Sequence, residues 1–259
     1  MLKPKVCVLR SAGTNCDQET AAAFKLAGGV PELLHINNLV NANKTLNDFQ
    51  ILALPGGFSY GDDVASGKIF ANELRFKLAE ELRKFIADGK LIIGICNGFQ
   101  ILVKSGLLPG HSGLEQDTSL ILNDSAKFEA RWVYLKPGGR CVWTKGLKKI
   151  IYLPVAHGEG KFVVQDKRVL SRLKKNNQIV FQYCDAQGKP GGYPDNPNGS
   201  LENIAGITDP TGRILGLMPH PERHLFSVQH PRKDELKFLR HGDGLQIFKN
   251  GIDYIKKNF

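Results

Sequence analysis

The sequence is poor in cysteine, and its few cysteines are not arranged in pairs. The 259 residues include five cysteines at distant positions, with no Cys-x-x-Cys motif: Cys7, Cys16, Cys96, Cys141 and Cys184. An odd number of isolated cysteines argues against a disulfide framework and against a zinc ribbon. This cysteine usage is typical of a protein in the reducing cytoplasm.

Long hydrophobic runs are also lacking. The first residues, MLKPKVCVLRSAG, contain too short an apolar stretch for a signal peptide, and no later stretch is long enough to cross a bilayer. Linkers, internal repeats and low-complexity segments are missing as well, which favours a single domain over residues 1–259. We therefore expect a cytoplasmic protein without a membrane segment.

Acidic residues are outnumbered, with 25 Asp and Glu against 35 Lys and Arg and a net charge of +10. The basic residues are scattered, are not interleaved with aromatic residues, and form no helix-turn-helix, KH or RRM pattern. A solvated basic surface explains this composition better than nucleic-acid binding does. The hydrophobic content of 42% is ordinary for a globular protein, and a chain of this length forms a core without covalent staples.

Apolar segments alternate with amphipathic ones through the first part of the chain. The predicted strands cover 5–9, 32–36, 49–54 and 91–95, and the predicted helices cover about 17–28 and one long segment, 71–85. The runs 49–54 and 91–95 are apolar throughout, as in strands that are buried on both faces. Strands that alternate with helices through short glycine-rich turns indicate an α/β fold with a mostly parallel sheet and helices on both faces.

From about residue 115, short β-like runs dominate the sequence. They cover 119–122, 130–135, 150–153, 161–164 and 179–183, and one basic helix is predicted over 166–175. Asp209-Pro-Thr-Gly212 predicts a turn that joins 204–207 and 214–218 in a hairpin. An amphipathic helix is predicted over 245–255. We therefore expect β hairpins in addition to the parallel sheet.

Residues 91–102, LIIGICNGFQIL, place a cysteine between a buried strand and a helix. In an open parallel sheet, ligands bind at the carboxyl ends of the strands, where Cys96 is located. The N-terminus of the following helix favours negative charge there, and Gly94 and Gly98 allow a tight turn, as in the nucleophile elbow of hydrolases. This pattern favours a thiolate nucleophile over the alternative of a buried small hydrophobe. Cys16, by contrast, has no neighbours in the sequence that support a role.

A thiolate nucleophile needs a base and a group that orients the base. His220 and Glu222, in Met218-Pro-His-Pro-Glu222, are the candidates. Each proline favours extended backbone in the residue before it, so we expect the two side chains to point the same way. An alternative is a metal site, since His220-x-Glu222-x-His224 has suggestive spacing. Pro221 disfavours a helix there and no cysteine pair accompanies it, so we expect no bound metal.

Paired glycines follow another buried strand, in Pro55-Gly56-Gly57. Glycine lets peptide N–H groups face a developing oxyanion, and we expect Gly57 to supply one donor. The N–H of Asn97, directly after Cys96, is the second expected donor. The alternative is a tight turn without a chemical role. A phosphate loop is not predicted, because Ile69 stands where Ser or Thr is required.

Seven motifs, in order over nearly the whole chain, resemble those of the class I glutamine amidotransferases. They are Gly56-Gly-Phe-Ser-Tyr-Gly-Asp62, Gly94-Ile-Cys-Asn-Gly-Phe-Gln100, Gly106-Leu-Leu-Pro109, Lys127-Phe-Glu-Ala-Arg-Trp-Val133, Ala156-His-Gly-Glu-Gly160, Asn196-Pro-Asn-Gly-Ser200 and Gly216-Leu-Met-Pro-His-Pro-Glu-Arg223. One such motif is weak, but seven together are specific. The segment 224–259 is less recognisable, and no role follows for it.

The resemblance implies a three-layer, flavodoxin-like fold that forms one glutaminase domain. It implies that Cys96 attacks the side-chain amide of L-glutamine, that His220 moves protons and that Glu222 holds His220. Ammonia would leave, and a glutamyl thioester would be hydrolysed to glutamate. The N–H groups of Gly57 and Asn97 would stabilise the oxyanion.

Further expectations come from the same resemblance. By its place in the motif, Gln100 would help to hold the substrate glutamine. The most similar members of the family pass ammonia to an ATP-dependent synthetase of purine biosynthesis, which implies a synthetase partner and leaves open a small third subunit. ATP and Mg²⁺ would belong to that partner, because nothing in this sequence resembles an ATP site and no cofactor is expected in this chain. The motifs at 156–160 and 196–200 contact the synthetase or only shape loops.

Three alternatives stay open. They are a stand-alone cysteine hydrolase of flavodoxin-like fold, a non-catalytic module that has kept the fold, and a glutaminase that serves another synthetase. Cys96, His220 and Glu222 are all present, which disfavours the non-catalytic module. A stand-alone hydrolase would act without a partner, whereas a glutaminase that delivers its ammonia is expected to be nearly inactive alone. Neither nucleic acid nor a membrane is expected among the partners.

Overall fold

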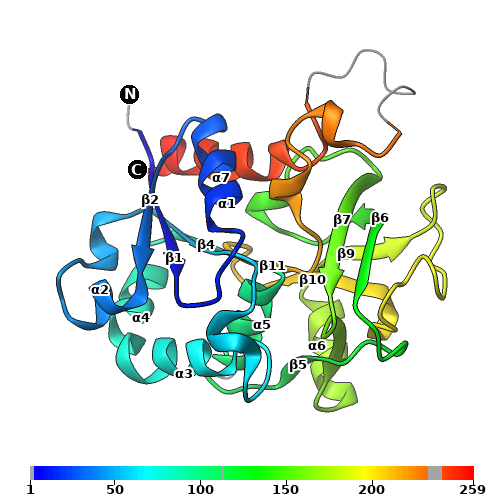
Figure 1. Ribbon diagram of the computed structural model, residues 1–259, viewed down its shortest axis with the longest axis horizontal. Coiled ribbons are helices and arrows are strands. Elements are labelled where there is room, and N and C mark those ends of the chain that lie inside the picture. Colours follow the sequence, from blue (N-terminus) through cyan, green and yellow to red (C-terminus); the bar gives the residue numbers. More distant parts are fainter. Residues whose placement is uncertain (1–2, 112–113, 233–240) are drawn as a thin grey trace.

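A nine-stranded sheet runs through the centre of the computed structural model, which describes residues 3–111, 114–232 and 241–259 (Figure 1). The strand order is β2-β1-β3-β4-β11-β10-β9-β6-β7. The strands are β1 (Lys5–Arg10), β2 (Val30–His35), β3 (Ile51–Leu54), β4 (Leu91–Ile95), β6 (Glu129–Pro137), β7 (Ile151–His157), β9 (Ile179–Cys184), β10 (Ile204–Thr208) and β11 (Ile214–Leu217). A separate two-stranded sheet pairs β5 (Thr118–Ile121) with β8 (Lys161–Val164).

The first five strands in this order form a parallel block, as the alternation of strands and helices predicts. β1 pairs with β2 and β3, and β4 lies between β3 and β11, all in parallel register. Every residue of β3 and β4 is buried, which agrees with their continuous apolar sequence. Because Ile95 of β4 lies opposite Leu217 of β11, the segments that follow these two strands leave the sheet at the same edge.

The remaining strands extend the same sheet in antiparallel register. β10 and β11 form the predicted hairpin, and β9, β6 and β7 follow as antiparallel neighbours. The Asp209 carboxylate closes the hairpin, because it accepts hydrogen bonds from the N–H groups of Thr211, Arg213 and Ile214. The predicted α/β fold with a parallel sheet is confirmed, and the predicted hairpins are continuous with that sheet.

Helices cover both faces of the parallel block (Figure 1). α1 (Asp17–Leu26) and α7 (Leu245–Asn258) pack together on one face, and α3 (Lys68–Lys77) and α5 (Asn97–Lys104) pack on the other. Phe24 of α1 meets Phe248 of α7 edge to face, with ring centroids 5.0 Å apart. The remaining helices are α2 (Ile36–Val40), α4 (Ala79–Ala87) and α6 (Lys167–Lys175). In the described ranges, every helix is too short or too polar to cross a membrane.

The long helix predicted over 71–85 is in fact two helices, α3 and α4. Leu78 lies between them with φ −121° and ψ 13°, outside the helical region. Leu74, Leu78 and Leu82 are all buried, so the bend keeps the apolar sides of both helices against the protein. A repeat at three and four residues indicates which side is buried, but not whether the axis bends. The prediction is therefore wrong about the continuity of the helix.

Candidate functional site

Cys96 lies on the sharp turn between β4 and α5. Its backbone has φ 53° and ψ −106°, which is uncommon for a residue with a side chain, and its N–H donates to the carbonyl of Leu217 at 2.8 Å. The turn depends on glycine, because a Cβ on Gly98 would lie 1.9 Å from the carbonyl oxygen of Leu54. A Cβ on Gly94 would lie 2.5 Å from the carbonyl oxygen of Gly98. The two glycines thus let α5 begin directly against the sheet.

The substitution Gly98→Ala is expected to lower the free energy of unfolding by about 3 kcal/mol, because the added methyl group overlaps a backbone oxygen. The matched control is Gly192→Ala, where a Cβ meets nothing within 4 Å. Urea-induced unfolding measures both variants. Equal stability of the two variants would contradict the close approach of α5 to β3.

The imidazole of His220 and the carboxylate of Glu222 form a buried pair. Nδ1 of His220 lies 2.6 Å from Oε1 of Glu222, and the two residues are 2% and 1% exposed. His220 has the extended backbone that Pro221 predicts, but Pro221–Arg223 then forms a short 3₁₀ turn. Proline suits the start of such a turn because its missing N–H would have no partner there. The carboxylate therefore reaches the imidazole from a turn and not from a fully extended chain.

This pair meets Cys96 because β11 leads to His220 and β4 leads to Cys96 at the same edge of the sheet. A Cβ built on Gly56 would lie 2.8 Å from Cε1 of His220 and 3.5 Å from Cβ of Cys96. Burial lowers the pKa of His220, but the Glu222 carboxylate and the Cys96 sulfur outweigh burial and hold that pKa well above its usual range. The site therefore favours an imidazolium between a sulfur and a carboxylate.

Gly57 and Asn97, the predicted oxyanion donors, directly follow Gly56 and Cys96, two of the residues at this meeting point. Among the residues that the structure describes, neither backbone N–H group has a hydrogen-bond acceptor. Gly57 has φ 144°, and a Cβ there would lie 2.7 Å from the backbone nitrogen of Asn15, so only glycine fits. Both N–H groups are thus available to a ligand. Their role with an oxyanion stays a prediction.

Gln100, the predicted substrate-binding residue, has its amide engaged on both sides. Its Nε2 donates to the carbonyl of Glu159 at 2.6 Å, and its Oε1 accepts from Nδ2 of Asn97 at 2.9 Å. The side chain therefore bridges α5 and the segment 156–160. A direct contact between Gln100 and substrate glutamine stays a prediction.

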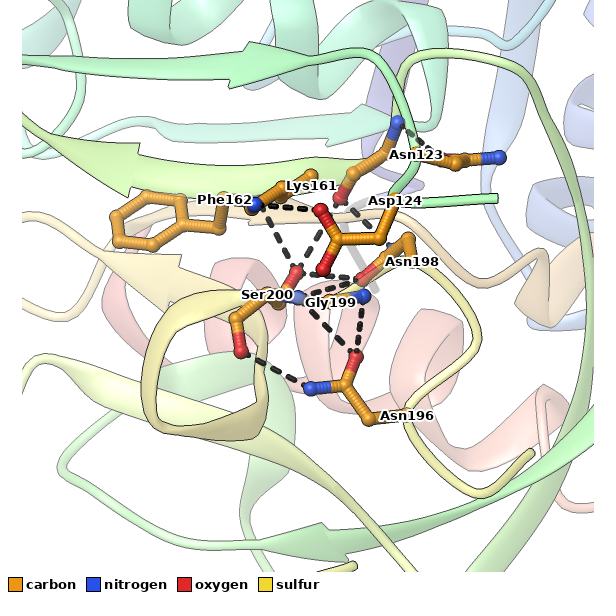
Figure 2. A network of polar contacts seen from close by, with 9 residues as sticks. Asn123, Asp124, Lys161, Phe162, Asn196, Asn198, Gly199 and Ser200 are labelled. Carbon is orange, nitrogen blue, oxygen red and sulfur yellow. Dashed lines mark hydrogen bonds and ion pairs between the residues drawn. The ribbon is translucent and has the colours of Figure 1, made fainter. Parts of the chain in front are cut away.

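Two buried asparagine side chains hold the segment 156–160 in place, and Figure 2 shows both of them, Asn123 and Asn198, within a larger network of polar contacts. Oδ1 of Asn123 accepts from the N–H of Gly160 at 3.0 Å, and Nδ2 of Asn198 donates to the carbonyl of Gly160 at 2.8 Å. Asn198 is fully buried, so its amide bonds inward. The segment also contacts the nucleophile, since Sγ of Cys96 lies 3.7 Å from the carbonyl oxygen of the segment's first residue. The network thus positions the backbone that lies against the thiol.

His157, within this segment, is buried and neutral, and it should make the stability depend on pH. Burial, assisted by the nearby His220, lowers the pKa of His157 from 6.5 to about 4. Because the folded state disfavours protonation of His157, the free energy of unfolding is highest above pH 6.5. It decreases as the pH falls toward 4, since the unfolded state then binds a proton that the folded state does not. The loss is on the order of 3 kcal/mol. Urea unfolding between pH 7.5 and 4 measures it.

The variant His157→Gln should show a weaker loss of stability over the same pH range than the wild type, because it has no imidazole to protonate. His241→Gln, which changes an exposed histidine, is the matched control and should keep the wild-type pH dependence. A wild-type pH dependence in His157→Gln would show that another group carries the effect.

Reasoning from the sequence missed Asn123 and Cys16. Asn123 directly follows a predicted strand and belongs to no pattern that indicates a function. Cys16 was expected to lack supporting neighbours, but one ligand atom each of Cys16, His220 and Glu222 lies within 4.8 Å of the others. That expectation is wrong because these neighbours come from a distant part of the chain. For the motif 196–200, the buried amide of its central asparagine favours loop structure over contact with a synthetase.

His224, the third member of the alternative metal motif, does not face this site. Its Nδ1 lies 2.8 Å from the carbonyl oxygen of Tyr152, and its ring meets Trp132 edge to face with centroids 5.0 Å apart. In the described part of the chain, the group of side chains suited to an ion includes His220 and Glu222 but not His224. The His-x-Glu-x-His spacing therefore does not produce a joint ligand set.

Known proteins resemble this chain in sequence over its whole length. Residues 3–255 match the family described as the CobB/CobQ-like glutamine amidotransferase domain. A protein of Methanococcus maripaludis, named phosphoribosylformylglycinamidine synthase subunit PurQ, is 47% identical over 269 residues, which cover 98% of this chain and 98% of that protein. A protein of the same name from Dehalococcoides mccartyi is 49% identical over 260 residues, which cover 99% and 100% of the two chains.

A solved structure shares the fold. It is described as the structure of PurLQS from Thermotoga maritima, and one of its chains matches with a TM-score of 0.75 at 33% identity. The match covers 98% of this chain and 100% of that chain. The similarity therefore extends into 224–259, for which the sequence motifs indicate no role.

Proposed function

The chain belongs to the family of CobB/CobQ-like glutamine amidotransferase domains, and we propose that it is the glutaminase subunit of phosphoribosylformylglycinamidine synthase. It hydrolyses L-glutamine to glutamate and ammonia, and it supplies the ammonia to a synthetase subunit in purine biosynthesis. The observation that carries this function is the meeting of Cys96, His220 and Glu222 at one edge of the sheet.

The sulfur of Cys96 acts as the nucleophile. Its thiolate adds to the side-chain carbonyl carbon of glutamine, and the C–N bond breaks as His220 gives a proton to the leaving nitrogen. Ammonia departs, and a γ-glutamyl thioester remains on Cys96. A water molecule then attacks the thioester while His220 accepts its proton, which releases glutamate and restores the thiolate and the imidazolium.

Glu222 and two backbone groups support these steps. The carboxylate, 2.6 Å from Nδ1 of His220, fixes the ring and stabilises the imidazolium. The N–H groups of Gly57 and Asn97 donate to the negative oxygen of the tetrahedral intermediate. Gln100 helps to hold the substrate glutamine. It does so through the segment 156–160, to which its Nε2 is bonded at the carbonyl of Glu159.

The synthetase subunit is the partner that uses the ammonia. In our proposal it binds ATP and Mg²⁺ and converts formylglycinamide ribonucleotide to the amidine, while this chain carries no cofactor. A small third subunit completes the assembly, and the complex works in the cytoplasm. The description of the Thermotoga maritima structure as PurLQS supports an assembly of this chain with other subunits.

Glutamate release by the chain alone and by the chain with its synthetase tests this function. We expect slow release from the isolated chain and an increase of about 100-fold when the synthetase, ATP and the ribonucleotide are present. Glutamate and amidine should form in equal amounts. Equal rates of glutamate release with and without the synthetase would instead favour a stand-alone hydrolase.

A further inference from the structure

Cys16 is a second thiol in the catalytic centre, and the proposed reaction does not use it. It directly precedes α1, is 1% exposed, and accepts a hydrogen bond from Nη2 of Arg223 at 3.1 Å. Its own N–H donates to the carbonyl of Gly56 at 3.1 Å. The start of α1 is thereby held against both the glycine loop and the turn that follows His220.

The two thiols of this centre flank one imidazole. A Cβ on Gly56 would lie 3.2 Å from Sγ of Cys16, 2.8 Å from Cε1 of His220 and 3.5 Å from Cβ of Cys96. One ligand atom each of Cys16, His220 and Glu222 lies within 4.8 Å of the others, and all three residues are buried. Cys96 does not belong to this group, so its side chain must turn toward Cys16 before the two sulfurs and the imidazole share one ion.

Nε2 is the open nitrogen of the His220 ring. It is buried and bonds to no nitrogen or oxygen among the described residues, whereas Nδ1 is bonded to Glu222 and the thiols of Cys16 and Cys96 lie next to the ring. A histidine that binds a metal through one nitrogen commonly donates its other N–H to a carboxylate, which is the arrangement of His220 and Glu222. Two sulfurs and one imidazole nitrogen suit Zn²⁺, and they do not suit Mg²⁺ or Ca²⁺.

We propose that Cys16, Cys96 and Nε2 of His220 form an inhibitory site for a thiophilic divalent cation of the Zn²⁺ class. On binding, two sulfur bonds and one nitrogen bond to the ion form. The protons on Cys16 and on Nε2 of His220 pass to solvent, and Cys96 binds as the thiolate of the resting site. A water molecule fills the fourth position of the tetrahedral ion. Because the ion is bound to both the nucleophile and the base, glutamine is not hydrolysed. This inhibition rests on the proposed function, whereas the binding of the ion does not.

Titration of the full chain with Co²⁺, an absorbing substitute for Zn²⁺, tests the ligand set directly. We expect one ion per chain, a thiolate-to-cobalt charge-transfer band and the visible bands of a tetrahedral ion, all lost when Zn²⁺ is added. Cys16→Ala should weaken Co²⁺ binding by at least about 10- to 100-fold. That is the loss in affinity when only a hydrogen-bond partner of a metal ligand is removed, and Cys16 is itself a ligand in the proposed site. Wild-type affinity in this variant, or a spectrum without the charge-transfer band, would overturn the site.

Cys141→Ala is the matched control for this titration. Cys141 lies beside the turn between β10 and β11, at the opposite end of β11 from His220, because a Cβ on Gly212 would lie 3.3 Å from Cα of Cys141. This variant should bind Co²⁺ as the wild type does. Equal weakening in Cys141→Ala and Cys16→Ala would also count against the site.

Protection of Cys96 supplies a readout in the unmodified chain, so the test does not depend on the folding of a variant. Zn²⁺ at about ten times its dissociation constant should slow the alkylation of Cys96 by iodoacetamide about 10-fold, measured by mass spectrometry. Unchanged alkylation would refute the proposal. A chain that binds Co²⁺ through these ligands but releases no glutamate from glutamine in the presence of its synthetase, ATP and the ribonucleotide would refute the proposed function alone.

Discussion

The substitution Cys96→Ala should abolish glutamine-dependent synthesis of the amidine by the complex while ammonium-dependent synthesis continues. Without Sγ no thioester forms, and loss of the nucleophile from a catalytic triad typically lowers kcat by about 10⁴-fold or more. Alanine keeps Cβ, so the contacts of the turn at Gly56 are retained. Formation of the amidine with glutamine or with ammonium as the nitrogen source measures the two activities separately.

Cys184→Ala is the control for this experiment, because it removes a buried thiol from β9, away from the turn after β4. It should retain both activities. Glutamine-dependent turnover that survives Cys96→Ala would show that another group attacks the amide, and the proposed mechanism would be wrong. Loss of the ammonium-dependent activity as well would place the defect in the assembly of the complex.

The substitution Glu222→Gln should lower the kcat for glutamine hydrolysis by about 10³- to 10⁴-fold. The carboxylate lies 2.6 Å from Nδ1 of His220 and is 1% exposed, so its charge acts on the imidazole with little screening. Burial of the ring lowers the pKa of His220, and the Glu222 charge raises it. Removing that charge therefore lowers the pKa of His220 and disfavours the imidazolium. The amide also permits the wrong tautomer of the ring. Steady-state kinetics should place the loss in kcat and not in KM.

Glu80→Gln is the matched control, because Glu80 is an exposed residue of α4. The conservative variant Glu222→Asp should recover part of the activity, since it restores the charge at a longer distance. If Glu222→Gln retained wild-type kcat, the carboxylate would have no part in proton transfer, and its pairing with His220 would be structural only.

Much of the fold could be predicted because the information is local. The continuous apolar runs 49–54 and 91–95 predict buried strands, and both are found, as β3 and β4. The bend at Leu78 could not be predicted, because it depends on what lies beneath the two helices and not on their own repeat. The same holds for the continuity of the antiparallel strands with the parallel block, which requires pairing between distant segments.

The sequence by itself determined the turn at Cys96 and the pairing of His220 with Glu222. Glycines on either side of a cysteine specify a tight turn, and two residues separated by one proline are close in any backbone that the proline allows. Only the tertiary structure decided that Cys16 joins them and that Asn123 supports the segment against the thiol. Contacts of that kind arise when distant segments meet at the edge of a sheet, and no local pattern encodes them.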